Sequence, residues 1–164
     1  MKIVWIIGAG KFGLKALNRL ATRHKGWQFV LVDKKLDPLV KFKEPNITVE
    51  QKDGARFLHD HLKSGTKVSW IIPSLPLHLA WEWCQMKIGS DKIEQIQVSS
   101  QIDTFLPHPI HGSNKDIYVS NADFICPSNC SEPEKVCTVT KCSRKKDMFR
   151  QLEELQFKDY MSIV

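Results

Sequence analysis

The chain has 164 residues, of which 24 are Lys or Arg and 18 are Asp or Glu, so its formal net charge is +6. This length suits one domain with its own core and is too short for a nucleotide domain joined to an ordinary substrate domain. The excess of cations is interpreted as spread along the chain, apart from a short basic run at residues 144–146, which favours solvated lysines over a nucleic-acid partner. No stretch reaches the roughly 18 apolar residues of a membrane span, and the apolar start runs into a glycine motif, so we expect a cytoplasmic protein without a signal peptide.

A glycine-rich turn follows the first predicted strand, at residues 3–7. Residues 8–13 have the pattern G-x-G-x-x-G, and a second apolar run at residues 29–32 ends in an aspartate. In a dinucleotide-binding βαβ unit the glycines permit a tight turn, a close pyrophosphate and close packing of helix on strand, and the acidic residue reaches a ribose. A glycine turn that binds no ligand is the alternative. The sequence predicts a dinucleotide site that includes Gly8, Gly10, Lys11, Phe12, Gly13, Asp33 and Lys34.

A helix is predicted between these two strands, with an apolar stripe formed by Phe12, Ala16, Leu17, Leu20 and Ala21. Unpaired N–H groups at its start would attract a diphosphate. The carboxylate of Asp33 favours NAD because it accepts hydrogen bonds from ribose hydroxyls and repels a 2′-phosphate. The neighbouring lysines would tolerate NADP. FAD is less favoured, because FAD-binding helices usually carry a small residue four positions after the third glycine, where this chain has Leu17.

Further strands are predicted at residues 46–50, 68–73 and 93–98, and helices at residues 55–62 and 75–86. Strands that alternate with helices predict an α/β fold with a doubly wound, mainly parallel sheet of the Rossmann type. We expect one domain over residues 1–164. Its cysteine-rich loop, residues 121–146, would precede a last helix at 148–157 and a last strand at 160–164.

Residues 1 to about 83 resemble the NAD-binding module of the potassium-transport regulatory family (TrkA-N or RCK domains) and, more loosely, Rossmann domains in general. The shared residues are Gly8, Gly10, Gly13, Asp33 and Asp53. The resemblance implies NAD as the cofactor and places Asp53, with Gly54 after it, beside the adenine. Residues after 101 carry no such resemblance.

In a doubly wound sheet, the ligand lies at the switch point between the first and fourth strands. Pro73 and Ser74 are expected there, and His78 would orient a substrate or transfer a proton. The favoured alternative is that Ser74 caps the following helix and His78 lies on its first turn.

Cys126, Cys130, Cys137 and Cys142 are spaced C-x3-C-x6-C-x4-C, and the remaining cysteine, Cys84, is expected in a helix core. Four thiolates suit zinc or an iron–sulfur cluster, although this spacing matches neither zinc ribbons nor ferredoxins. A redox thiol pair and incidental cysteines are the alternatives. His108 or His111 would complete a Cys3His site without Cys142, but two exposed loop histidines are favoured.

These features together predict an NAD(H)-binding Rossmann protein with a metal-binding cysteine loop. It would act as a cofactor-sensing or redox subunit, with a homodimer or a larger redox or transport complex as its partner. The alternatives are an oxidoreductase that uses NAD(P) with an iron–sulfur or zinc centre, and a zinc-stapled interaction module with a vestigial nucleotide site.

Overall fold

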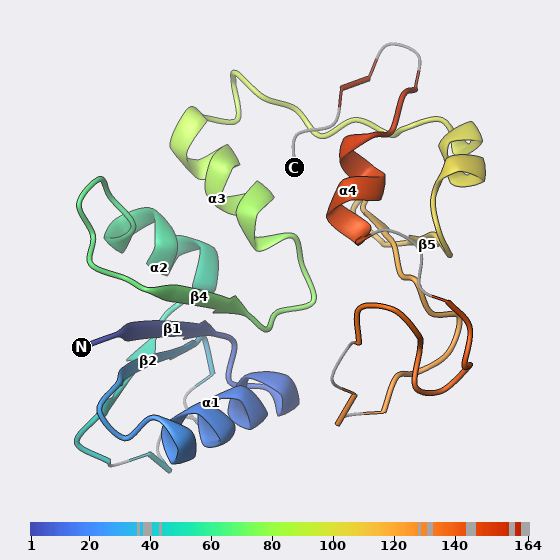
Figure 1. Cartoon of the computed structure of the whole chain (residues 1–164). Helices are drawn as coiled ribbons and strands as arrows, with labels where there is room; N and C mark the ends of the chain where they lie inside the picture. The colour runs from blue at the N-terminus through green and yellow to red at the C-terminus, as the bar shows by residue number, and fades with distance from the viewer. Residues whose placement is uncertain are drawn as a thin grey trace. The chain divides into compact units, whose positions relative to one another are not determined.

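The computed structural model describes residues 1–35, 37, 41–42, 44–127, 129–130, 133–143, 147–157 and 160–161. Its contacts divide the chain into two compact units, Met1–Glu94 and Gln95–Val164 (Figure 1). The predicted parallel sheet and the helices that cover it belong to the first unit. That both units form one domain over residues 1–164 remains a prediction.

The first unit is built on a parallel sheet of four strands, β1 (Ile3–Ile7), β2 (Gln28–Asp33), β3 (Ile47–Gln51) and β4 (Trp70–Pro73). They lie in the order β3-β2-β1-β4, and Ile7 at the end of β1 pairs with Val32 on one side and Pro73 on the other. The central strands read as continuous apolar runs because both of their faces are buried. The first four predicted strands and the mixed α/β class are therefore confirmed.

Helices cover both faces of this sheet. Helix α1 (Lys11–Arg23) packs on one face, where Leu17 lies in a buried cluster with Val4 and Phe29. Helices α2 (Gly54–His61) and α3 (Leu79–Ile88) pack on the other face, against Trp5 and Ile7 among others. Figure 1 shows the sheet between α1 and the pair α2 and α3. The arrangement is compatible with a Rossmann-like fold.

The predicted apolar stripe of α1 is wrong at Phe12, whose side chain is 72% exposed. Gly13 and Leu17 are buried, and Leu20 packs against the same core. At about 100° per residue, Phe12 lies far around the helix from the centre of this buried face. The helix therefore turns its first aromatic residue to solvent.

Two later predictions are also wrong. Residues 93–98 form no strand, which leaves β4 at the edge of the sheet. Their three apolar residues are separated by polar ones, whereas a strand covered on both faces needs a continuous apolar run. The helix predicted from residue 75 begins only at Leu79. Pro76 disfavours helical backbone at Leu75, which accounts for the loss of the predicted start. Ser74 is consequently not its cap.

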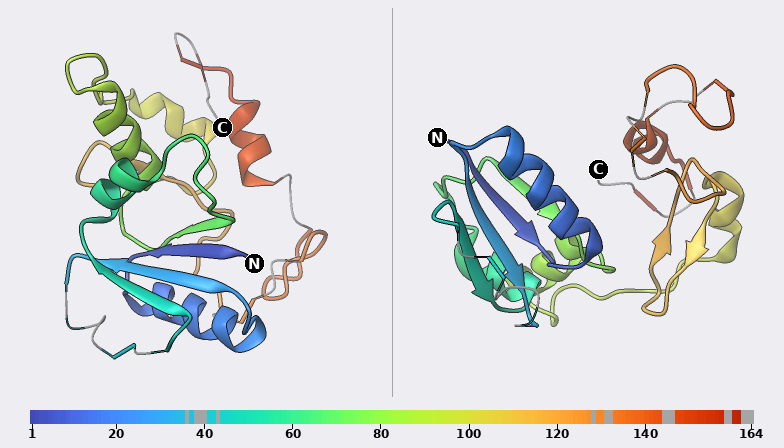
Figure 2. Two further views of the ribbon diagram at one scale, coloured as in Figure 1. Left: turned by 90° about the vertical axis from the view of Figure 1, so that its left-hand side faces the viewer. Right: turned by 90° about the horizontal axis from the view of Figure 1, so that it is seen from below.

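The second unit contains short elements: a 3-10 helix η1 (Ser100–Phe105), an antiparallel pair β5 (Ile110–His111) and β6 (Ile117–Tyr118), and α4 (Met148–Glu153) (Figure 2). Ile102 is the one apolar side chain that is buried among the described residues of this unit. The predicted last helix is confirmed but shorter. Most of the predicted strand at 160–164 lies outside the described residues.

Candidate functional site

The turn after β1 is too tight for side chains at two of its three glycines. Gly8 has φ +108°, and its N–H donates to the carbonyl oxygen of Val32 at 2.8 Å. A Cβ on Gly8 would lie 2.7 Å from the carbonyl oxygen of Ser74, and a Cβ on Gly13 would overlap the carbonyl oxygen of Gly8. The first glycine therefore makes the turn, and the third lets α1 pack directly on it.

Gly10 differs from the other two glycines. It is exposed, precedes the first residue of α1, and a Cβ built on it would meet no atom within 4 Å. The first turn of α1 contains no acidic residue, and Lys11 and Phe12 are exposed beside it. Open space thus lies next to the end of α1 where backbone N–H groups have no partner within the helix.

Asp33 joins the ends of β1 and β2. Its Oδ2 accepts a hydrogen bond from the N–H of Ala9 at 2.7 Å, and its Oδ1 accepts one from the N–H of Lys35 at 2.8 Å. The carboxylate therefore anchors the glycine turn to the turn after β2. An ionised carboxylate has about four acceptor positions, so two further donors can still approach it.

Asp53 and Gly54 form the start of α2 at the same edge of the sheet. Asp53 caps the helix, because its Oδ1 accepts a hydrogen bond from the N–H of Arg56 at 3.1 Å. Gly54 is buried: a Cβ on it would overlap the side chain of Ile7 and lie 2.8 Å from Cδ1 of Leu75. Both residues thus have structural contacts. A position beside an adenine remains a prediction for them.

The loops after β1 and β4 diverge at the expected switch point. The N–H of Ser74 donates to the carbonyl oxygen of Ile7 at 2.8 Å, and Pro73, at the end of β4, is exposed. From this point α1 passes to one face of the sheet and α3 to the other. His78 is exposed at the cap position of α3 and makes no side-chain cap bond there.

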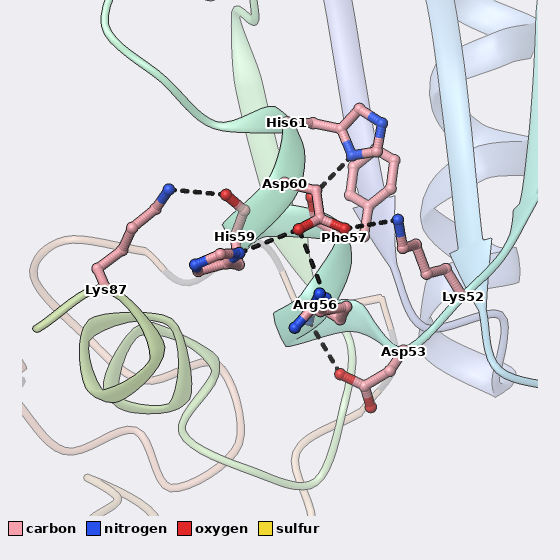
Figure 3. Close-up of polar contacts among 8 residues, drawn as sticks. All are labelled: Lys52, Asp53, Arg56, Phe57, His59, Asp60, His61 and Lys87. Atoms are coloured by element: carbon pink, nitrogen blue, oxygen red, sulfur yellow. Dashed lines mark hydrogen bonds and ion pairs between the residues drawn. The ribbon is translucent and has the colours of Figure 1, made fainter. Parts of the chain in front are cut away.

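A cluster of charged residues holds α2 in place (Figure 3). The carboxylate of Asp60 lies 2.7 Å from Nζ of Lys52, 3.0 Å from Nδ1 of His59 and 3.5 Å from Nε of Arg56. The hydrogen bond from His59, followed by that from Lys52, holds the pKa of Asp60 well below its usual value of 3.8. Lys87 of α3 donates to the carbonyl oxygen of His59 at 2.7 Å, so the cluster also ties α3 to α2.

Acid should weaken this cluster. Because the pKa of Asp60 is lower in the folded than in the unfolded protein, its contribution to stability is complete above about pH 4 and is lost as the pH falls further. Asp60→Asn should lower the free energy of unfolding at pH 7 and reduce its dependence on pH below about pH 4. Urea unfolding at several pH values measures both effects. An equal pH dependence in the parent, Asp60→Asn and the control Asp123→Asn would contradict the role of Asp60.

The cysteine segment is described only in part, and its four cysteines differ in their surroundings. Cys137 and Cys142 flank a tight turn: the N–H of Cys137 donates to the carbonyl oxygen of Cys142 at 2.9 Å, and Sγ of Cys137 accepts from the N–H of Thr140 at 3.5 Å. Cys130 is half-buried and Cys126 exposed. Within the described ranges, no three His, Cys, Asp or Glu side chains come close enough to hold a metal ion.

The alternative metal ligands, His108 and His111, lie on the surface of the second unit. His108 is exposed with φ +43°, and Nε2 of His111 lies 2.8 Å from Oδ2 of Asp103. The exposed-loop interpretation therefore fits His108, whereas His111 is exposed but lies in β5 and contacts Asp103. Cys84 is half-buried in α3 rather than enclosed in the core.

Metal binding by Cys126, Cys130, Cys137 and Cys142 remains a prediction with a direct test. Because the second unit buries so little apolar surface, thiolate bonds to zinc or iron would supply order that packing does not. Protein purified without air should then contain the metal, and a chelator should open cleavage by trypsin at Lys135 or Lys141 while the first unit stays intact. Metal-free fresh protein with the same cleavage pattern in chelator would rule the metal out.

The fold defines an α/β protein in which the loops after β1, β2 and β4 meet at the carboxyl ends of the parallel strands. Residues 78–164 match the family model AF_1314_C, described as "Uncharacterized protein, C-terminal domain". The match covers more than half of the 164 residues, so the chain belongs to this family. No curated protein and no solved structure matches the chain. None of the described helices is long and apolar enough to cross a membrane.

The expectation that the cationic excess is spread along the chain is wrong. Residues 1–32 contain six Lys or Arg residues and no Asp or Glu, so residues 33–164 contain 24 − 6 = 18 cations and 18 acidic residues and have no net charge. The signal is present in the sequence as a recurrence at every fourth position of α1. Its members are Lys11, Lys15, Arg19 and Arg23.

Proposed function

We propose that the first unit binds NAD(H), with the pyrophosphate in the open space beside Gly10. The contrast among the glycines carries this proposal. Gly8 and Gly13 are packed too closely for a side chain, whereas Gly10 faces empty space at the N-terminus of α1. Packing alone explains the first two glycines but not the third. Backbone N–H groups and the dipole at the start of a helix provide a binding site for a diphosphate.

The position of Asp33 supports NAD over NADP. Its two hydrogen bonds hold the carboxylate beside the glycine turn, and its remaining acceptor positions suit two ribose hydroxyls. A 2′-phosphate at the same place would meet a like charge. The resemblance to TrkA-N modules favours the same cofactor.

We place this unit in a cofactor-sensing or redox subunit, because the glycine turn contacts the segment that leads into α3. A Cβ on Gly8 would lie 2.9 Å from Cδ2 of Leu75, and a Cβ on Gly54 would lie 2.8 Å from Cδ1 of the same leucine. Leu75 therefore packs between the glycine turn and the start of α2. An adjustment of the turn around a ligand would move Leu75 and the start of α3, where the family match begins at His78.

Calorimetric titration with NAD, NADH and NADP tests the proposal. Gly10→Val should fold and lose at least about 100-fold in NAD affinity, because its side chain would occupy the place of the pyrophosphate. Gly26→Val is a matched control, because a Cβ there also meets no atom within 4 Å and Gly26 lies outside the turn after β1. Parent-like binding by Gly10→Val, or no binding by the parent, would contradict the proposal.

A further inference from the structure

The whole net charge of the protein is carried by its first 32 residues, and most of it lies on α1. Four of the six cations there are in this helix, and the helix contains no acidic residue. The strands on either side are largely buried, so they present little surface that would dilute the charge. The result is a basic surface on a chain that is otherwise balanced.

These four residues, the basic row, form a regular array. Lys11, Lys15, Arg19 and Arg23 recur every four residues and span about 18 Å of helix axis. All are exposed except Lys15, which is half-buried. Partial burial and then the charges of Arg19 and Lys11 lower the pKa of Lys15, so neighbours in the row interact.

The basic row is unfavourable for the helix itself. Like charges at positions i and i+4 destabilise a helix, and Lys11 in the first turn opposes the helix dipole, whereas Arg23 in the last turn complements it. A local feature that works against folding is expected where it serves a function. Binding of a polyanion would convert this repulsion into attraction.

An exposed aromatic residue at one end of the basic row identifies the class of polyanion. Phe12 is 72% exposed and lies one position after Lys11 and three before Lys15. We infer that the outer face of α1 binds single-stranded nucleic acid, with the phosphates along the basic row and a base stacked on Phe12. Cations along a backbone path combined with aromatic stacking are the usual means of binding single strands. An acidic protein would use the cations and could pack an apolar side chain on Phe12, so binding to an acidic polypeptide is one of the outcomes that the test distinguishes.

This inference does not depend on the NAD proposal, and it is tested with the full chain and a labelled single-stranded oligonucleotide of mixed sequence. Fluorescence anisotropy should show binding that weakens by roughly 50-fold between about 50 mM and about 200 mM salt, as expected for four phosphate contacts. Phe12→Ala should weaken binding about tenfold. Reversal of three cations away from the glycine turn, Lys15→Glu with Arg19→Glu and Arg23→Glu, should remove most of the binding.

A second triple variant, Lys63→Glu with Lys67→Glu and Lys92→Glu, is the control. Both triples lower the net charge by six, from +6 to 0, but the control changes only exposed lysines outside α1. If the α1 triple does not fold by circular dichroism, the corresponding Gln variants replace both. Equal loss in both triples, no binding at low salt, or binding to polyglutamate or anionic vesicles in place of the oligonucleotide would overturn the inference. Unchanged NAD affinity in the α1 triple would show that Lys15, Arg19 and Arg23 take no part in nucleotide binding.

Discussion

Gly13→Ala is expected to destabilise the first unit by about 3 kcal/mol or more, at the upper end of the range for overpacking. The added methyl group would overlap the carbonyl oxygen of Gly8 and lie 3.3 Å from Cβ of Ser74. The oxygen belongs to the backbone of a turn held by the hydrogen bond between Gly8 and Val32, so it cannot move aside cheaply. Urea unfolding followed by circular dichroism measures the change.

Gly26→Ala provides the matched comparison for this prediction. A methyl group at Gly26 meets no atom within 4 Å, so the free energy of unfolding should change by less than about 1 kcal/mol. If the Gly13 and Gly26 variants were equally stable, the close packing of α1 on the turn after β1 would be wrong.

Asp33→Ala is expected to lower NAD affinity at least about tenfold and to reduce the preference for NAD over NADP. It removes the acceptor for the N–H groups of Ala9 and Lys35, which frees the glycine turn, and it removes a negative charge from the ribose site. Titration with both nucleotides gives the two affinities and their ratio.

Asp33→Asn separates the two contributions of the carboxylate. Its amide oxygen can still accept the hydrogen bond from Ala9, so the glycine turn should stay anchored, but the negative charge is lost. We expect Asp33→Asn to retain more NAD affinity than Asp33→Ala. We expect both variants to tolerate NADP equally well, because both lack the negative charge. An unchanged ratio of NAD to NADP affinity in both variants would show that Asp33 does not face the ribose.

The parts of the fold that were predicted correctly depend on local patterns. Continuous apolar runs marked β1 and β2, and the alternation of strands with helices predicted the parallel class of the sheet. The glycine spacing predicted a tight turn followed by a helix packed directly on it, which the packing at Gly8 and Gly13 confirms. These features follow from backbone sterics within a few residues.

The incorrect predictions concern residues whose position depends on more distant neighbours. Residues 93–98 carry enough β-branched residues for a strand but form none, and Phe12 lies four residues before Ala16 of the predicted stripe but faces solvent. Spacing alone does not determine which side of a helix meets the sheet. That orientation is set by the closest approach, here at Gly13.

The sequence by itself therefore determined the first four strands, the glycine turn, and the concentration of positive charge before Asp33. Only the tertiary structure decided that Asp33 anchors Ala9, that Gly54 is buried against Ile7, and that no three His, Cys, Asp or Glu side chains of the described residues come together. The physical reason is range. Apolar runs and glycine turns act within a few bonds, whereas contacts across the edge of a sheet depend on strand order, register and the packing of helices far apart in the chain.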